Sequence, residues 1–183
     1  MRPATLSKRT STRASSKSGD VNMDALQEQF ECWVGDQVIK RYNTDHGMSF
    51  QFHQRAGEAP DLEYRDGSRS LKVEVSTAYY DDKEHAKFVW LAARKQPEAP
   101  HKWSGVDFDK KLVENINERL DAKCRKSYGP NCVLAVYVFP ILTRVWEIEL
   151  CLKDIRVPAT NPFDAIFLCG DFPPAEFKVW KLV

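Results

Sequence analysis

This chain lacks the features that mark several common protein classes. No apolar run approaches the ~20 residues that a membrane-spanning helix requires, and no hydrophobic signal-peptide core is present. A glycine-rich phosphate loop, a G-x-S-x-G nucleophile motif and internal repeats are also missing. We therefore expect a soluble, cytoplasmic protein without a membrane partner, whose function has to be inferred from less common motifs.

Paired cysteines are missing as well. The five cysteines are scattered, odd in number, and form no C-x-x-C motif. Four of them lie in or beside apolar stretches: Cys124, Cys132, Cys151 and Cys169. This pattern predicts free, buried thiols in a reducing compartment and argues against a zinc site.

A large net charge is absent from the chain as a whole, which has 27 basic and 26 acidic residues. Residues 1–20 hold five basic residues and one acidic residue, so the remaining 163 residues carry 22 basic and 25 acidic ones. A tight DNA binder is usually basic because its affinity comes largely from phosphate neutralisation. The mildly acidic remainder therefore counts against tight binding to DNA.

The first 20 residues differ in composition from the rest. They are rich in Ser, Thr, Lys and Arg, and they cannot bury enough apolar surface to offset the entropy cost of ordering. We expect a disordered basic tail that acts as a solubilising segment, a loose nucleic-acid-binding arm or an organellar transit peptide. Residues 21–183 are long enough for a single α/β domain with its own core.

Helical and strand patterns are interspersed along this domain. Apolar residues recur at spacings of three and four in three segments, which predicts helices over residues 22–42, 84–95 and 107–128. Short alternating or continuous apolar runs predict strands over residues 48–54, 133–139, 145–150, 165–169 and 177–182. The runs at 133–139 and 165–169 are typical of strands covered on both faces, whereas 177–182 alternates like an edge strand.

The most informative stretch is Pro60–Ser76, which reads P-D-L-E-Y-R-D-G-S-R-S-L-K-V-E-V-S. Asp66-Gly67 is a strong hairpin signal because glycine readily adopts the positive φ that the turn requires. After the turn, apolar and polar residues alternate with the period of a half-buried strand: Leu71, Lys72, Val73, Glu74, Val75 and Ser76. One face of this strand is predicted to be apolar, and the other to carry a lysine, a carboxylate and a hydroxyl.

Asp61 lies on the preceding predicted strand, where it can stand beside Glu74. Two carboxylates held together repel each other unless a cation or a proton lies between them, and a hard divalent metal such as Mg²⁺ is the usual solution. His85 and His101 lie on different elements without paired ligand spacing, so each is expected to be a surface or loop residue. The sequence therefore predicts a carboxylate metal site rather than a histidine one.

This pair of motifs resembles the PD-(D/E)XK nuclease superfamily, which has the restriction-endonuclease-like fold. Pro60-Asp61 and Glu74 match the family's Pro-Asp and Glu-x-Lys motifs, and Ser76 stands where the family has its lysine. The chain is similar to a divergent branch that has Glu-Val-Ser or Glu-Val-Thr in place of Glu-x-Lys. The resemblance implies an α-β-β-β-α-β core over about residues 22–140, with extra C-terminal strands.

The resemblance also implies a metal site that binds Mg²⁺ or Mn²⁺. Its ligands would be Asp61, Glu74 and a backbone carbonyl near Val75. The family's first helix often adds a carboxylate. Glu31 is the better-placed candidate because it falls at the edge of the apolar stripe, whereas Glu28 points nearly opposite to it. A rim glutamate on a solvated helix is the alternative interpretation of Glu31.

The motif lysine is replaced by Ser76, so another cation would have to take its place. Lys123 projects within the apolar arc of the helix over residues 107–128, and burying an unpaired ammonium is costly. It is either a snorkelling side chain at the helix end or the displaced catalytic lysine. Lys72 is the rival for the catalytic role, and Ser76 would hydrogen-bond a metal-bound water.

Three functions remain open from the sequence. In the first, the protein is a metal-dependent nuclease that hydrolyses phosphodiester bonds in DNA or RNA. In the second, it is a catalytically inactive nuclease-fold module for binding or scaffolding. In the third, it is an unrelated α/β domain in which the motifs are coincidental. The oligomeric state also remains open.

Overall fold

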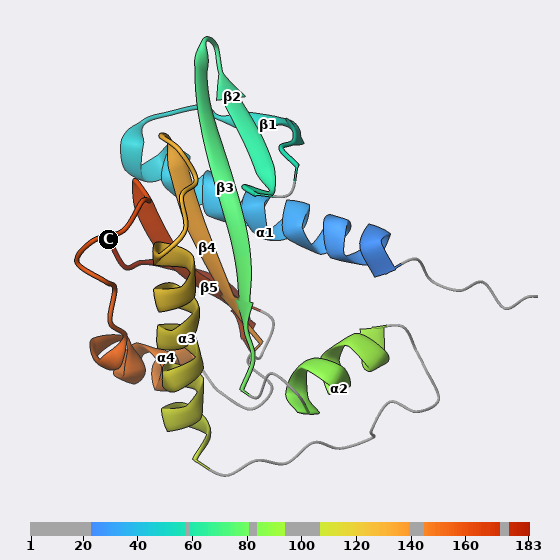
Figure 1. The fold of residues 1–183 in the computed structure, drawn as a ribbon, viewed down its shortest axis with the longest axis vertical. Coiled ribbons are helices and arrows are strands. Elements are labelled where there is room, and N and C mark those ends of the chain that lie inside the picture. The colour runs from blue at the N-terminus through green and yellow to red at the C-terminus, as the bar shows by residue number, and fades with distance from the viewer. Residues whose placement is uncertain (1–22, 58, 81–83, 94–106, 140–144, 173–175) are drawn as a thin grey trace, which may run out of the picture.

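A six-stranded mixed sheet forms the centre of the molecule (Figure 1). The computed structural model describes residues 23–57, 59–80, 84–93, 107–139, 145–172 and 176–183. The predicted tail over residues 1–20 and His101 lie outside the described residues. Among the described helices, none is long and apolar enough to cross a membrane.

The strands follow one another across the sheet in chain order. Their bounds are β1 (Gln51–Arg55), β2 (Leu62–Asp66), β3 (Arg69–Ala78), β4 (Cys132–Val138), β5 (Ala165–Phe172) and β6 (Glu176–Lys181). β1, β2 and β3 pair antiparallel, β3, β4 and β5 pair parallel, and β6 returns antiparallel to β5. The predicted mixed sheet flanked by helices is therefore confirmed, with β6 at one edge as expected.

Helices cover both faces of this sheet and give three layers (Figure 1). α1 (Met23–His46) crosses one face, whereas α3 (Phe108–Cys124) and α4 (Val145–Cys151) lie on the other. The 3₁₀ helix η1 (Leu152–Asp154) follows α4, and α2 (Glu84–Ala93) lies beyond the end of β3.

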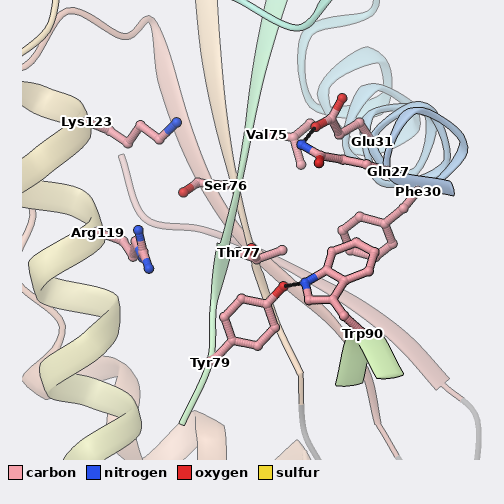
Figure 2. A pocket seen from close by; sticks show the side chains of 10 residues that line it. All are labelled: Gln27, Phe30, Glu31, Val75, Ser76, Thr77, Tyr79, Trp90, Arg119 and Lys123. Atoms are coloured by element: carbon pink, nitrogen blue, oxygen red, sulfur yellow. Dashed lines mark hydrogen bonds between the residues drawn. The ribbon is translucent and has the colours of Figure 1, made fainter. Parts of the chain in front are cut away.

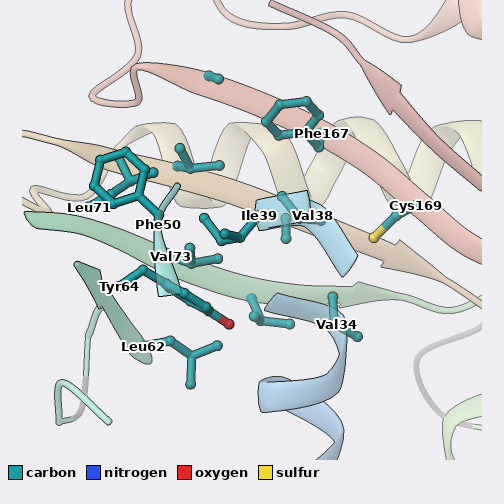
Figure 3. Packing of buried hydrophobic residues seen from close by; sticks show 14 of the residues in the cluster. Val34, Val38, Ile39, Phe50, Leu62, Tyr64, Leu71, Val73, Phe167 and Cys169 are labelled. Atoms are coloured by element: carbon teal, nitrogen blue, oxygen red, sulfur yellow. The ribbon is translucent and has the colours of Figure 1, made fainter. Parts of the chain in front are cut away.

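Apolar side chains fill the space between α1 and the sheet (Figure 3). Val34 and Val38 are fully buried there, and they belong to the same cluster as residues of four strands: Leu62, Val73, Ala135 and Phe167. Full burial of such a side chain stabilises the fold by roughly 1.5–3 kcal/mol. This packing fixes α1, and the polar residues of its first turns, relative to β3.

On the opposite face, Leu112, Ile116 and Leu120 of α3 are buried against the sheet. They are four residues apart, which was the basis for predicting this helix. The side chains of Leu134 and Leu168, from β4 and β5, complete the cluster. Both strands are buried on their two faces, as their continuous apolar runs predicted.

The hairpin predicted at Asp66-Gly67 is confirmed. Gly67 has a φ of 59°, and β2 and β3 pair on either side of the turn. β2 pairs only with residues 69–73 of β3, so the second half of β3 extends past the end of β2. This overhang, which begins at Glu74, provides the platform for the candidate site.

Two predictions about local structure are wrong. Residues 145–150 form part of the helix α4, not a strand; Ile148 is buried against α3, whereas Leu150 is 61% exposed. A six-residue alternating pattern can fit one turn and a half of helix as well as a strand. His85 is not a surface residue: it is fully buried, and its Nδ1 accepts a hydrogen bond from the Tyr80 N–H at 2.9 Å.

All five cysteines are free thiols. Cys132 and Cys169 are buried, and the other three are partly exposed. The expectation of free thiols is confirmed, and that of burial holds for these two.

Candidate functional site

A cleft with a volume of about 360 Å³ lies along the overhanging half of β3, between α1 and α3 (Figure 2). We call it the β3 cleft. Its lining comes from three helices, from β3 and from Tyr79 just after β3: Gln27, Phe30, Glu31, Val75, Ser76, Thr77, Tyr79, Trp90, Arg119 and Lys123. Segments far apart in the sequence therefore meet where β3 leaves the β1–β2 hairpin.

Lys123 lines the cleft on its α3 side and forms an ion pair with Glu74, which does not itself line the cleft. Lys123 Nζ lies 2.5 Å from Glu74 Oε1, and the Tyr128 hydroxyl donates to the same oxygen at 3.3 Å. The side chains of Glu74 and Lys123 are 5% and 19% exposed. Burial, followed by the neighbouring Glu74 carboxylate, raises the pKa of Tyr128, so its hydroxyl stays protonated and remains a donor.

Asp61 approaches the same strand from the end of the β1–β2 connection. Its Oδ2 accepts a hydrogen bond from the Val75 N–H at 2.7 Å. Burial raises the pKa of Asp61 to about 6, the Glu74 and Glu31 carboxylates add to the increase, and the Val75 N–H opposes it. Two neighbouring carboxylates therefore act on Asp61 at the start of the overhang.

Glu31 is 7% exposed, so it is not the solvated rim residue that one interpretation expected. Its Oε1 accepts from Gln27 Nε2 at 2.8 Å, and its Oε2 accepts from Arg55 Nη2 at 3.0 Å. Arg55 comes from β1, and its guanidinium places a cation beside Glu31. The structure thus brings Glu31 to the cleft with a counter-ion.

The two candidates flanking Glu74 on its own face of β3 lie differently. Ser76 is 8% exposed and lines the cleft, pointing toward α3 in Figure 2. Lys72 Nζ lies beside Gly129, where a Cβ built on that glycine would be 3.8 Å away, and Lys72 does not belong to the cleft lining. Of the two lysines considered from the sequence, Lys123 is therefore the one in the cleft.

Several cleft residues were missed from the sequence. Arg119 precedes Lys123 by four residues on α3, a spacing that places both on one helix face and that could have identified it. Phe30, Tyr79 and Trp90 supply aromatic rings from α1, the end of β3 and α2. Nothing local in the sequence indicates that these three rings meet, because tertiary packing alone brings them together.

The fit of a divalent metal can be judged from the carboxylates. No group of three or more His, Cys, Asp or Glu side chains within the described ranges is spaced to hold a metal ion. Mg²⁺, however, is commonly bound by only one or two carboxylates, with water and substrate phosphate completing its shell. Glu74 Oε2 is buried without a hydrogen-bond partner among the described residues, which leaves an acceptor available to a cation. This Glu74 oxygen, with Asp61 hydrogen-bonded to the next residue of β3, suits a site of this kind.

Glu31, the Lys123 ammonium and the Arg119 guanidinium line the β3 cleft, whereas Asp61 and Glu74 adjoin it through their contacts with Val75 and Lys123. Together these groups suit the binding of a metal ion and a phosphate group. Its geometry is the only basis for assigning a function, because no protein family, curated protein or solved structure matches this chain.

Proposed function

We propose that this protein is a metal-dependent nuclease that hydrolyses phosphodiester bonds in DNA or RNA, built on a PD-(D/E)XK-like core. The order of elements supports the fold assignment. Helix α1, the antiparallel strands β1 to β3, helix α3 and the parallel strand β4 follow in the sequence that this core requires, with α2 inserted before α3. β5 and β6 are the extra C-terminal strands.

The observation that carries the proposal is the contact between Lys123 and Glu74. The motif position on β3 holds Ser76, yet the ammonium of Lys123, which lines the cleft, reaches the motif carboxylate of Glu74 on the same strand. A lysine relocated to a neighbouring helix would restore the positive charge that the substitution on β3 removed. The Tyr128 hydroxyl would hold the Glu74 carboxylate in place.

Asp61 and Glu74, with the Val75 carbonyl, would hold Mg²⁺ or Mn²⁺. Such an ion, when bound, lowers the pKa of a bound water and offsets charge on the scissile phosphate. The Val75 N–H orients Asp61, and the Gln27 and Arg55 side chains orient Glu31 at the edge of the site. Glu31, with Arg55 as its counter-ion, would act mainly on the electrostatics of Asp61.

The other cleft residues would act on the phosphate. Lys123 and Arg119 would place two positive charges near its oxygens, where preorganised cations stabilise the charge that develops in the transition state. The Ser76 hydroxyl would donate a hydrogen bond to a water or phosphate oxygen. Ser76 is buried, and Lys123 and Arg119 are partly buried, so water screens their interactions less than at an open surface.

The test is a titration of nuclease activity with Mg²⁺ and Mn²⁺ on single- and double-stranded DNA and RNA. Wild type, Asp61→Asn, Lys123→Met and Lys123→Arg are compared, with Lys126→Met as a control because Lys126 is exposed on the same segment. We expect metal-dependent cleavage that falls about 100- to 1,000-fold in Lys123→Met, recovers in part in Lys123→Arg and is unchanged in Lys126→Met. Activity indifferent to Asp61→Asn would rule out Asp61 as a ligand.

A binding module without catalysis is the second candidate. It is favoured by the two ion pairs, Lys123–Glu74 and Arg55–Glu31, which already neutralise both glutamates without a metal. This alternative predicts nucleic-acid or protein binding that is indifferent to Mg²⁺ and Mn²⁺. Circular dichroism on every variant separates a loss of activity from a loss of folding.

A further inference from the structure

Three aromatic side chains form one wall of the β3 cleft (Figure 2). This aromatic wall consists of Phe30 on α1, Tyr79 after β3 and Trp90 on α2. The Phe30 and Trp90 rings meet edge to face with centroids 6.4 Å apart, and Trp90 Nε1–H donates to the Tyr79 hydroxyl at 2.7 Å. Phe30 and Trp90 are half-buried, so each still presents part of its ring to the cleft.

Contacts with Phe139 and Asn115 hold the aromatic wall in place. Phe139 stacks on Tyr79 and on Phe30, with centroids 5.3 and 5.6 Å away and interplanar angles of 6° and 16°. Asn115 of α3 donates through Nδ2 to the carbonyls of Tyr79 and Tyr80 at 2.8 and 2.7 Å. These contacts fix the rings before a ligand arrives, which lowers the entropy cost of binding.

Cationic side chains occupy the opposite side of the same cleft. Arg119 and Lys123 project from α3 toward β3, and Ser76 lies between them and the aromatic wall (Figure 2). The cleft therefore has aromatic rings on one side and two cationic side chains on the other. A nucleotide has the complementary shape, with a planar base at one end and an anionic phosphate at the other.

We propose that the β3 cleft takes one unpaired nucleotide of a single-stranded nucleic acid, with its base stacked on Trp90 and its edge toward Phe30, and with its phosphate toward Arg119 and Lys123. This inference rests on the proposed nuclease function for the placement of the phosphate. Every base has a π face, so stacking on aromatic rings accepts any sequence. A base inside a duplex has to be unpaired and unstacked before it enters, which disfavours double-stranded substrates.

This mode of binding also agrees with the charge of the chain. Residues 21–183 carry 22 basic and 25 acidic residues, so their composition is not the basic one that is typical of tight duplex binders. Stacking supplies affinity that does not depend on counterion release. Each contact between a cation and a phosphate of a single strand contributes about −0.7 to the slope of log K against log salt concentration. Two such contacts therefore predict a slope of about −1.4.

The test measures fluorescence anisotropy of labelled 12-nucleotide oligomers with the full chain. Asp61→Asn is the background, so that no probe is cleaved. The probes are single-stranded DNA, single-stranded RNA, the blunt DNA duplex and a DNA strand with its central residues abasic. Trp90→Leu removes the stacking ring, Trp90→Phe keeps a ring, and Trp33→Leu is the matched control. The ring centroids of Trp33 and Phe30 are 6.1 Å apart, but Trp33 does not line the cleft.

We expect a single strand of DNA or RNA to bind at least tenfold more tightly than the duplex. Trp90→Leu is expected to weaken single-strand binding about 5- to 100-fold, the range for loss of one stacked base, whereas Trp90→Phe and Trp33→Leu stay within about threefold. The abasic strand is expected to bind weakly to the protein that retains Trp90, and its affinity is expected not to change in Trp90→Leu. That insensitivity distinguishes lost stacking from a change in folding.

The outcomes separate this inference from the proposed function. Single-strand binding that depends on Trp90, together with no metal-dependent cleavage by the wild-type chain, supports the inference and overturns the nuclease proposal. Equal affinity for duplex and single strand, or no effect of Trp90→Leu, overturns the inference even where metal-dependent cleavage is found. Absence of binding to all four probes overturns it as well.

Discussion

At the scale of single residues, the candidate site depends on the ion pair between Glu74 and Lys123. Both side chains are largely withdrawn from water. Attraction between two buried charges is offset by the loss of their hydration, so such a pair is weak grounds for stability in itself. Removing one partner is different, because the remaining charge is then buried without compensation.

We therefore expect Lys123→Met to destabilise the protein by about 2–4 kcal/mol, somewhat below the full range for buried pairs because Lys123 keeps partial contact with water. Glu74→Gln in the same chain is expected to recover most of this loss, since it removes the uncompensated carboxylate. Urea unfolding of the two single variants and the double variant measures the coupling. Additive losses would show that the two side chains do not interact in solution.

How far residues could be predicted from the sequence depends on whether their pattern is local. Glu74 and Asp61 came from motifs, and Lys123 stood out as a lysine within an apolar arc of its helix. The Arg55–Glu31 pair was missed because it joins β1 to α1 across 24 positions, and no local pattern records that meeting. Trp90 was missed for the same reason.

At the scale of elements, α1 packs closely on the β1–β2 hairpin and so positions Asp61 and Glu31 together. Tyr64 of β2 donates to Asp36 Oδ1 of α1 at 2.9 Å. Gly35 lies at this contact, where a Cβ would fall 2.4 Å from Leu62 Cδ1 and 2.6 Å from the Tyr64 hydroxyl oxygen. A glycine within this helix is therefore explained by the approach of the hairpin.

Gly35→Ala is consequently expected to lower stability. Alanine favours a helix by about 1 kcal/mol over glycine, but overpacking of a core contact typically costs about 1–3 kcal/mol. We expect a net loss of about 1 kcal/mol, reduced when Leu62→Val makes room, whereas Lys40→Ala on the exposed face of α1 stays within about 0.5 kcal/mol. Thermal unfolding of these variants is the measurement. A more stable Gly35→Ala variant would contradict the close contact.

Element types could be predicted wherever an apolar pattern was long or continuous. The spacing of Leu112, Ile116 and Leu120 identified α3, and the continuous apolar runs identified β4 and β5. The error at α4 arose because an apolar pattern only six residues long, over 145–150, has too little periodicity to distinguish helix from strand. Order and pairing of the strands cannot be obtained from such patterns, because they depend on long-range contacts.

At the scale of the whole molecule, the β3 cleft lies where the three layers meet. β2 pairs only with the first half of β3. The helices α1 and α3 lie on either side of the remaining overhang of β3, which is paired with β4. Packing of both layers holds the carboxylates near one another despite their repulsion. Stability of the whole fold thus offsets an unfavourable arrangement of charge at the site.

This arrangement connects the site to the stability of the whole protein through Asp61. A carboxyl pKa raised from 3.8 to about 6 means that the folded state holds the Asp61 proton more tightly than the unfolded state does. The resulting stabilisation is present below pH 3.8 and is lost as the pH rises to about 6. We therefore expect Asp61→Asn, which keeps an acceptor for the Val75 N–H, to raise the melting temperature at pH 8 and to change it little below pH 4.

Mg²⁺ is expected to raise the melting temperature of the wild type at pH 8, by the equivalent of about 2.7 kcal/mol at 100 times its dissociation constant, and to leave that of Asp61→Asn unchanged. Differential scanning calorimetry with Mg²⁺, with Mn²⁺ and with a chelator measures both effects, and an equal response of the two proteins to Mg²⁺ would mean that the ion binds elsewhere.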